Sequence, residues 1–211
     1  MILRSPLHPH RPLAAPDDCS RSAARRRPSR EGGRPWRLLL LVCLLGSSIW
    51  LASPSAARSG AGEYQLKAAF LYNFLKFVDR PAEAVTSPTT ICIGILGRDP
   101  FEDALDSLKG KLAKGRRVVV LRVRSVEEAR SCDLLFVSAS EKGRLSHLLK
   151  QANTLHLLTV ADQQGFCEAG GMINLVTVNN RIAFDVNLAA ANRARLKISS
   201  QLLRLAHSVL E

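Results

Sequence analysis

The sequence predicts an α/β domain with a mostly parallel sheet, helices on both faces, a C-terminal antiparallel hairpin and a long C-terminal helix. Two observations support this prediction. Short apolar runs without alternation, typical of strands covered on both faces, recur between helical segments. The stretch 170–206 then places two alternating strands before a continuous helical pattern. Repeated strand–helix–strand order favours a parallel sheet with helices on both sides.

The chain divides into a leader, residues 1–57, and one domain, residues 58–211. Arginines flank the start of an apolar run at 38–51, and small residues follow it up to Ala57. These features are typical of a secretory signal peptide, so we predict export and cleavage after Ala57. An uncleaved anchor, the alternative, needs about 20 apolar residues. Residues 1–33 lack periodicity and are expected to be disordered.

The charge of the chain argues against one class of function. The formal net charge is +12, of which the leader contributes nine basic against three acidic residues, or +6. The remaining residues hold 21 basic and 15 acidic side chains, again +6, over a much longer stretch. Basic and acidic side chains in these numbers are typical of an ordinary solvated surface. Without a basic stripe interleaved with aromatics, we expect no nucleic-acid binding.

The domain begins with a strongly apolar helix over residues 64–78. Its apolar side chains form two adjacent stripes: Leu66, Phe70, Phe74 and Phe77 in one, and Leu71, Leu75 and Val78 in the other. We expect this helix to be buried against the sheet. The alternative is that part of so wide an apolar face contacts a partner or a second copy of the chain.

Four buried strands follow, at 91–96, 118–123, 133–137 and 157–160. Helices are predicted between them, with Asp99, Ser125 and Ser140 as capping residues. The next two strands form a hairpin around Asn179-Asn180, because asparagine tolerates the left-handed conformation of a tight turn. This turn implies a register that sorts apolar from polar residues. The apolar pairs are Ile173 with Val186, Leu175 with Phe184 and Thr177 with Ile182; the polar-side pairs are Asn174 with Asp185 and Val178 with Arg181.

The last predicted element is a helix from Asn187, its N-cap, to the C-terminus. Two apolar stripes recur along it at helical spacing, one through Ala191, Ile198 and Leu205 and one through Leu196 and Leu203. A helix that covers one sheet needs a single stripe. The second stripe is therefore expected to pack on the N-terminal helix or on another subunit.

The sequence contains no recognisable catalytic or metal-binding pattern. The GILG sequence at 94–97 lacks the glycines and lysine of phosphate loops, and Asp99 opposes an anion there. Ser138 and Ser140 lack the surroundings of a nucleophile elbow, and His147 and His156 have no evident nucleophile nearby. The cysteines show no metal-ligand spacing. We therefore expect no enzyme, no cofactor and no metal site.

The loop at 165–171 is the candidate binding segment of the domain. Its residues are Phe166, Cys167, Glu168, Gly170 and Gly171, with Ala169 between them. The adjacent glycines either permit close approach of a ligand or partner to the backbone, or form a tight bend before the hairpin. Both interpretations remain open at the level of sequence.

Several blocks of the sequence resemble the YfiR family of periplasmic proteins, in the family's order and spacing. They are AAFLYNFLKFVDRP (68–81), ICIGILGRDPF (91–101), SCDLLFVSASE (131–141), LTVADQQGF (158–166), GGMINL (170–175) and NRIAFDVNLAAANRARLKISSQLLRLA (180–206). The resemblance implies a non-catalytic periplasmic regulator. It would bind the periplasmic segment of an inner-membrane diguanylate cyclase, repress it and so control cyclic di-GMP and biofilm formation. A compact α/β fold that can form a homodimer is also implied. The alternative is a periplasmic small-molecule sensor that uses the 165–171 loop.

The resemblance also bears on the cysteines. Cys92 and Cys132 match the positions of a family disulfide, and their expected places near the ends of adjacent strands agree with such a bond. It would close a loop of about 40 residues and stabilise the fold by about 3–4 kcal/mol. Cys167 matches one half of a second disulfide whose other half is absent. We therefore expect Cys167 to be a free thiol or to pair between subunits.

Overall fold

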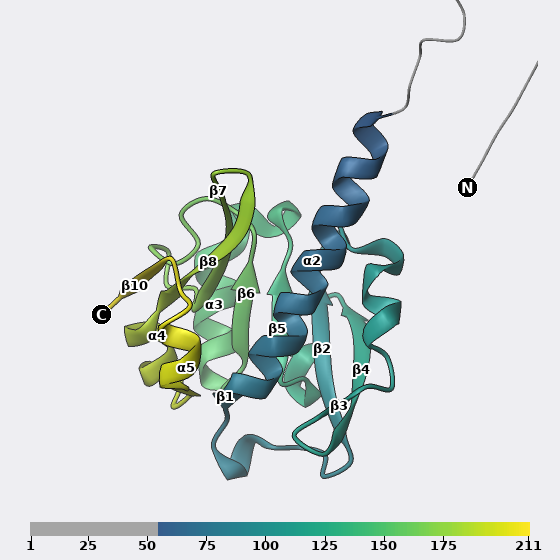
Figure 1. Ribbon diagram of the computed structural model, residues 1–211. Helices are drawn as coiled ribbons and strands as arrows, with labels where there is room; N and C mark the ends of the chain where they lie inside the picture. The colour runs from purple at the N-terminus through teal and green to yellow at the C-terminus, as the bar shows by residue number, and fades with distance from the viewer. Residues whose placement is uncertain (1–54) are drawn as a thin grey trace, which may run out of the picture. The chain divides into compact units, whose positions relative to one another are not determined.

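A mixed eight-stranded β-sheet organises residues 55–211, the part of the chain that the computed structural model describes (Figure 1). The predicted leader lies outside the described residues, except for its last three positions, where the helix α2 (Ser55–Phe77) begins. The strand order is β10-β8-β7-β6-β5-β2-β4-β3. The strands are β2 (Thr90–Leu96), β3 (Leu112–Ala113), β4 (Arg116–Val123), β5 (Leu134–Val137), β6 (Leu158–Ala161), β7 (Ile173–Val178), β8 (Arg181–Asn187) and β10 (Ser208–Leu210).

The directions of the strands correct the prediction of a mostly parallel sheet. Strands β4, β2, β5, β6 and β7 run parallel to one another, and each predicted buried strand lies among them. Strand β3 is antiparallel to β4, and β8 is antiparallel to β7. Strand β10 lies outside β8 and parallel to it. The sheet is mixed because an antiparallel strand lies near each edge, β3 at one and β8 at the other. Strand β10, and not the hairpin β7–β8, forms the outer edge on that side.

Alternating residues of the central strand β2 separate the two faces of the sheet. Ile91, Ile93 and Ile95 belong to one buried cluster, while Cys92 and Leu96 belong to the other. A strand side-chain period of two requires this separation. Because both faces of β2 are covered, its sequence is apolar throughout and shows no alternation.

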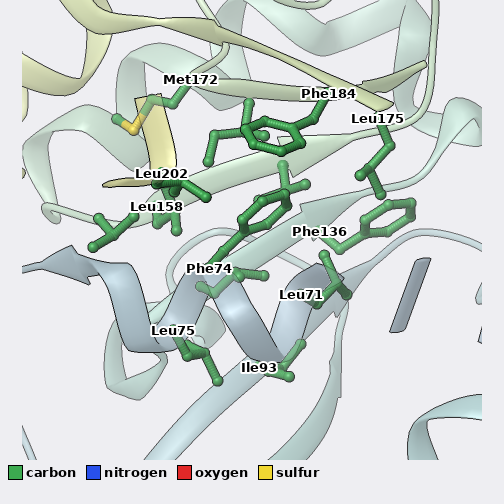
Figure 2. Close-up of a cluster of buried hydrophobic side chains, with 14 of the residues drawn as sticks. Leu71, Phe74, Leu75, Ile93, Phe136, Leu158, Met172, Leu175, Phe184 and Leu202 are labelled. Atoms are coloured by element: carbon green, nitrogen blue, oxygen red, sulfur yellow. The ribbon is translucent and has the colours of Figure 1, made fainter. Parts of the chain in front are cut away.

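The helix α2 covers the first face of the sheet. Leu71, Phe74 and Leu75 are buried, and the rings of Phe74 and Phe184 meet edge-to-face with centroids 5.2 Å apart. Figure 2 shows these side chains gathered between α2 and the strands. Complete burial of one such side chain contributes about 1.5–3 kcal/mol to folding. By contrast, Leu66 in the N-terminal half of α2 is 48% exposed, so the apolar face of the helix is wider than the sheet covers.

The second face is covered by the helix α3 (Leu145–Thr154) and by short 3-10 turns. Leu148, Leu149 and Ala152 of α3 pack with Phe166 in one cluster. The predicted helix after Asp99 is the 3-10 helix η3 (Glu102–Leu108), which lies on the α2 side. The other 3-10 helices are η2 (Ala82–Ala84), η4 (Glu128–Ser131) and η5 (Ala139–Arg144).

The hairpin β7–β8 has the register that its sequence predicts. Every predicted pair is present, from Ile173 with Val186 to Val178 with Arg181. Asn179 and Asn180 both adopt the left-handed conformation, with φ of 49° and 60°. Two consecutive positive φ values give the turn a twist that matches the strands.

The predicted long C-terminal helix is wrong. Asn187 is an N-cap as expected, because its side chain accepts a hydrogen bond of 2.7 Å from the Ala190 amide, but the helix α4 (Leu188–Arg193) ends early. Arg195 has a φ of 58°, which breaks the helix. The chain then forms β9 (Lys197–Ile198), which pairs with β1 (Val78–Asp79), the short helix α5 (Ser200–Leu203) and the edge strand β10.

Candidate functional site

The predicted binding loop at 165–171 presents little of itself to solvent. Phe166, Cys167 and Gly171 are buried, Gly170 is half-buried, and Glu168 is exposed. The backbone bends tightly, because the Gly171 amide donates to the Phe166 carbonyl at 2.9 Å and the Gly170 amide to the Cys167 carbonyl at 3.0 Å. Of the five predicted residues, Glu168 is therefore the one whose side chain is best placed to contact a partner or ligand.

Next to this loop lies a polar cleft of about 380 Å³, which we call the β6–β7 cleft. Strand β6 pairs with β7 only through Val160 and Ala161, so the rest of β7 is uncovered on that side. The N-terminal half of α2 and the loop after β6 border the opening. The lining residues are Glu63, Lys67, Asp162, Gln163, Gln164, Gly165, Glu168, Asn174, Leu175, Val176, Thr177 and Asp185.

A buried ion-pair network forms one wall of the β6–β7 cleft. Lys67 is only 6% exposed, and its Nζ lies 2.7 Å from both the Asp162 Oδ2 and the Glu63 Oε1. The Tyr64 hydroxyl donates to the same Asp162 oxygen at 3.1 Å. Burial alone would lower the pKa of Lys67, but its hydrogen bonds to Asp162 and Glu63 outweigh this and raise it. The wall thus holds a charged lysine, and its two carboxylate partners are already paired with it.

Two side chains of the cleft have buried polar atoms without a partner. Gln163 is 8% exposed and Asn174 is 5% exposed. Neither the Gln163 Oε1 and Nε2 nor the Asn174 Oδ1 forms a hydrogen bond within the described part of the chain. Such an atom costs about 1–3 kcal/mol. Both residues line the cleft, but each of these atoms exposes less than 1 Å² to solvent, so the atoms lie behind the wall of the cleft.

The β6–β7 cleft is acidic although the domain is basic. Its four carboxylates, at Glu63, Asp162, Glu168 and Asp185, stand against the single ammonium of Lys67, a formal charge of −3. Asp185 also lies 2.9 Å from the His207 Nδ1, which offsets part of this charge when the imidazole is protonated. The cleft therefore favours cationic groups.

Sequence reasoning missed this site because its parts are distant in the chain. Lys67 and Asp162 are 95 positions apart, and each is an ordinary polar residue in its own segment. One signal was present. Asp162 and Gln163 follow an apolar strand directly, and Asn174 interrupts another.

The three cysteines of the described residues, Cys92, Cys132 and Cys167, are unbonded in the structure, and all three are buried. Cys92 and Cys132 lie together on the second face of the sheet, and a hydrogen bond between their side chains, followed by burial, raises the pKa of Cys92. The predicted Cys92–Cys132 disulfide would join these two neighbouring thiols, and it stays a prediction. Burial, followed by the nearby Asp185, raises the pKa of Cys167 to about 12, so its thiol is a poor nucleophile at neutral pH.

Asp133 organises a second charged cluster at the start of β5. Its Oδ1 lies 3.0 Å from Arg116 and 3.4 Å from Arg80, and its Oδ2 accepts from the Cys92 amide at 2.9 Å. Burial lowers the pKa of Arg80, against the opposing effect of Asp133. The Arg80 guanidinium also donates to the carbonyls of Cys132 and His156, at 2.8 Å each. This cluster fixes the strand ends that carry Cys92 and Cys132.

Most of the remaining residues that the sequence singled out form hydrogen bonds or ion pairs within the fold. His156 contacts the Ala194 carbonyl through Nδ1 at 2.8 Å, and His147 is exposed. Ser138 caps η5, while Asp99 accepts from the Phe101 amide and pairs with Arg122. Within residues that the structure describes, no three His, Cys, Asp or Glu side chains come together as a possible metal site. The described helices also include none with the length and apolar character needed to span a bilayer.

The mixed sheet with helices on both faces places the described domain in the class of α/β domains. A model of the YfiR/HmsC-like family matches residues 64–207, and the chain belongs to this family. This match confirms the resemblance seen in the sequence. Members of the family are in general periplasmic regulators of diguanylate cyclases.

Other comparisons are more distant. No curated protein matches the chain. Among solved structures, a conserved domain protein from Vibrio cholerae O1 biovar El Tor is similar at 12% identity and a TM-score of 0.45, with 69% of this chain covered. An ABC domain in complex with L-Trp from Streptococcus pneumonia is similar at 13% identity and a TM-score of 0.44, with 70% covered. The chain spans 60% of the length of each of these two chains.

Proposed function

We propose that the protein is exported to the periplasm and there binds and represses an inner-membrane diguanylate cyclase by contacting its periplasmic segment. The observation that carries this proposal is the family match over residues 64–207, which spans nearly all of the described domain. By lowering cyclic di-GMP, the protein would act against biofilm formation. It acts by binding and needs no catalytic residue of its own.

The surface that we expect to contact the cyclase lies between α2 and the tip of the β7–β8 hairpin. A groove of about 560 Å³ runs there, which we call the α2–hairpin groove. Leu66 is exposed in it, and Phe70 and Ile182 are half-buried. Apolar side chains that are at least partly exposed and gathered in one groove are typical of protein-contact surfaces. Glu168 of the predicted loop lies in the neighbouring β6–β7 cleft, which shares Glu63 and Thr177 with this groove.

Binding between the purified protein and the purified periplasmic segment of the cyclase tests the proposal. We expect a complex at low micromolar concentrations. Leu66→Arg should weaken it at least tenfold, because a charge would enter the apolar contact. Leu112→Arg changes a leucine outside the groove that is more exposed, at 61% against 48%, and should not weaken the complex. Absence of a complex at tens of micromolar would contradict the proposed function. Equal binding by the two variants would contradict only the assignment of the groove.

The 165–171 loop is tested in the same assay. Glu168→Gln removes the one exposed charge that the loop offers. If the loop contacts the cyclase, this variant should weaken the complex, and Asp103→Asn, an exposed carboxylate on η3, should leave it unchanged. Unchanged binding by Glu168→Gln would assign contact to the groove alone.

A further inference from the structure

The positive charge of the domain is concentrated in one short segment. Residues 109–124 contain seven basic side chains, no acidic one and no aromatic one. Of the 21 basic residues of the domain 58–211, the other 14 lie outside this segment together with all 15 acidic residues, a net charge of −1. The segment contains β3 and β4, which form one edge of the sheet (Figure 1). The excess of basic residues therefore belongs to one edge of the fold and not to the whole surface.

Three of these seven basic residues have no carboxylate partner. The other four form ion pairs, which are Lys109 with Asp106, Lys114 with Asp79, Arg116 with Asp133 and Arg122 with Asp99. Lys111, Arg117 and Arg124 are exposed and form no ion pair within the part of the chain that the structure describes. The exposed Lys76 of α2 lies near Lys111, since their Nζ atoms are 5.4 Å and 5.8 Å from the centroid of the Tyr72 ring. The edge thus presents uncompensated positive charge.

Exposed leucines lie among these cations. Leu112 of β3 and Arg117 of β4 are directly paired, so their side chains project from the same face of the sheet. Leu121 lies on that face as well, because a strand has a side-chain period of two. Leu112 is 61% exposed and Leu121 is 43% exposed. A tight turn joins the two strands, with φ of 51° at Lys114 and 75° at Gly115. One edge therefore carries both exposed apolar side chains and unpaired cations.

We propose that this surface docks the protein on an anionic lipid bilayer. We call it the β3–β4 edge, and it consists of Lys111, Leu112, Arg117, Leu121 and Arg124. The basic side chains contact the headgroups, and the leucines enter the boundary between headgroups and acyl chains. A bilayer fits both features, because it presents negative charge above an apolar layer. Nucleic acid fits less well, since the segment has no aromatic side chain to stack on bases. The inference does not depend on any contact with a cyclase.

Sedimentation with lipid vesicles tests the proposal. The purified domain 58–211 is suitable, because it contains both buried clusters of the fold and lacks the apolar run at 38–51. Vesicles of phosphatidylglycerol and phosphatidylcholine in equal amounts should bind it about tenfold more tightly, or better, than vesicles of phosphatidylcholine alone. The binding should weaken as the salt concentration rises, because exposed charges are screened. Equal binding to both kinds of vesicle, or no binding to either, would overturn the proposal.

Two double variants locate the charge. Lys111→Gln with Arg117→Gln should weaken binding to the anionic vesicles about tenfold or more, because each basic residue near such a surface contributes about fivefold. Arg193→Gln with Arg204→Gln is the matched control, since it removes two exposed arginines near the opposite edge of the sheet. This control should change the affinity less than about twofold, because charges far from the membrane are screened. Equal losses in the two double variants would show a response to net charge alone and would overturn the site.

A pair of single variants tests the apolar contact. Leu112→Ser should weaken vesicle binding about fivefold, because less apolar surface enters the membrane. Leu205→Ser changes a leucine that is 69% exposed near the opposite edge, and it should bind as the parent does. Neither variant should change the melting temperature, since both leucines are exposed. If Leu112→Ser binds the anionic vesicles as tightly as Leu205→Ser, the assignment of the docking surface is overturned.

Two other occupants of the β3–β4 edge would give different results. Binding of the domain to soluble polyglutamate without binding to vesicles would identify an acidic protein as the occupant. A dimer of the domain that Lys111→Gln with Arg117→Gln dissociates, again without vesicle binding, would identify a second copy of the chain. Either result would overturn the assignment to a lipid bilayer.

Discussion

Gly171 lies directly beneath the ring of Phe166, so closely that a Cβ at position 171 would be 2.2 Å from the Phe166 Cε1. Only glycine lets the ring enter the second buried cluster while the chain turns into β7. The Gly171 amide also donates to the Phe166 carbonyl at 2.9 Å, so the same two residues close the bend. The loop is thereby a fixed support for Glu168 at the edge of the β6–β7 cleft.

Gly171→Ala should therefore destabilise the protein by about 2–3 kcal/mol, because the methyl group displaces a buried aromatic ring. Chemical denaturation of the variant and the parent measures this difference. Gly143→Ala is the matched control, since a Cβ at that position meets nothing within 4 Å, and it should change stability by less than about 0.5 kcal/mol. Equal stability of the two variants would contradict the described packing.

The hairpin turn predicts different effects on stability for two substitutions at one position. Asn180 has a φ of 60°, which glycine adopts readily and a β-branched residue does not. Asn180→Gly should leave the free energy of unfolding within about 0.5 kcal/mol of the parent, while Asn180→Val should lower it by about 1–2 kcal/mol. Thermal or chemical unfolding decides, and a valine variant as stable as the glycine variant would be incompatible with the described turn.

The Lys67 network predicts a loss of stability at alkaline pH. The pKa of Lys67 is raised above its ordinary 10.5, and burial, followed by Asp162, raises the pKa of Tyr64 above 10.0. In both cases the folded state holds the proton more tightly than the unfolded chain. Their contribution is fully present below about pH 10 and is lost as pH rises through the raised values. The free energy of unfolding should fall over the interval above about pH 10.

Lys67→Met and Tyr64→Phe keep most of each side chain's volume and remove its titration. Each variant should lose stability less steeply over this interval than the parent, whatever its stability at pH 8. Denaturant titrations at several pH values give the slopes. If the free energy of unfolding fell more steeply with pH in either variant than in the parent, the proposed role of this network would be contradicted.

The adjacent thiols of Cys92 and Cys132 predict a disulfide in the oxidised, exported protein. Intact-mass measurement before and after reduction should show a gain of two hydrogen atoms. Cys132→Ser should abolish the gain and Cys167→Ser should preserve it, because the Cys167 thiol is buried and its pKa is raised to about 12. An unchanged mass in the parent protein would refute the bond.

The elements that the sequence predicts correctly are those determined by local rules. The register of β7 with β8 follows from a two-asparagine turn and an alternating pattern, both of which are local. Strand β2 is recognisable because six consecutive apolar or glycine residues, 91–96, leave no face for solvent. These properties need no knowledge of distant contacts.

The C-terminal segment was mispredicted because helical spacing is not specific to a continuous helix. Ala191, Leu196 and Leu202 are buried as the apolar pattern implies, but they reach the core from α4, an irregular segment and α5. The break depends on Arg195 and on pairing of β9 with β1, about 120 positions away. The β6–β7 cleft escaped prediction for the same reason, since Lys67 and Asp162 meet only after folding.

Cyclic di-GMP measured in cells tests the central claim most directly. Cells that carry the cyclase should contain several-fold more cyclic di-GMP when the gene for this protein is deleted. Re-expression of the parent protein should restore the lower level, whereas the Leu66→Arg variant, expressed to the same amount, should not. Unchanged cyclic di-GMP on deletion, or a decrease, would contradict repression of a diguanylate cyclase.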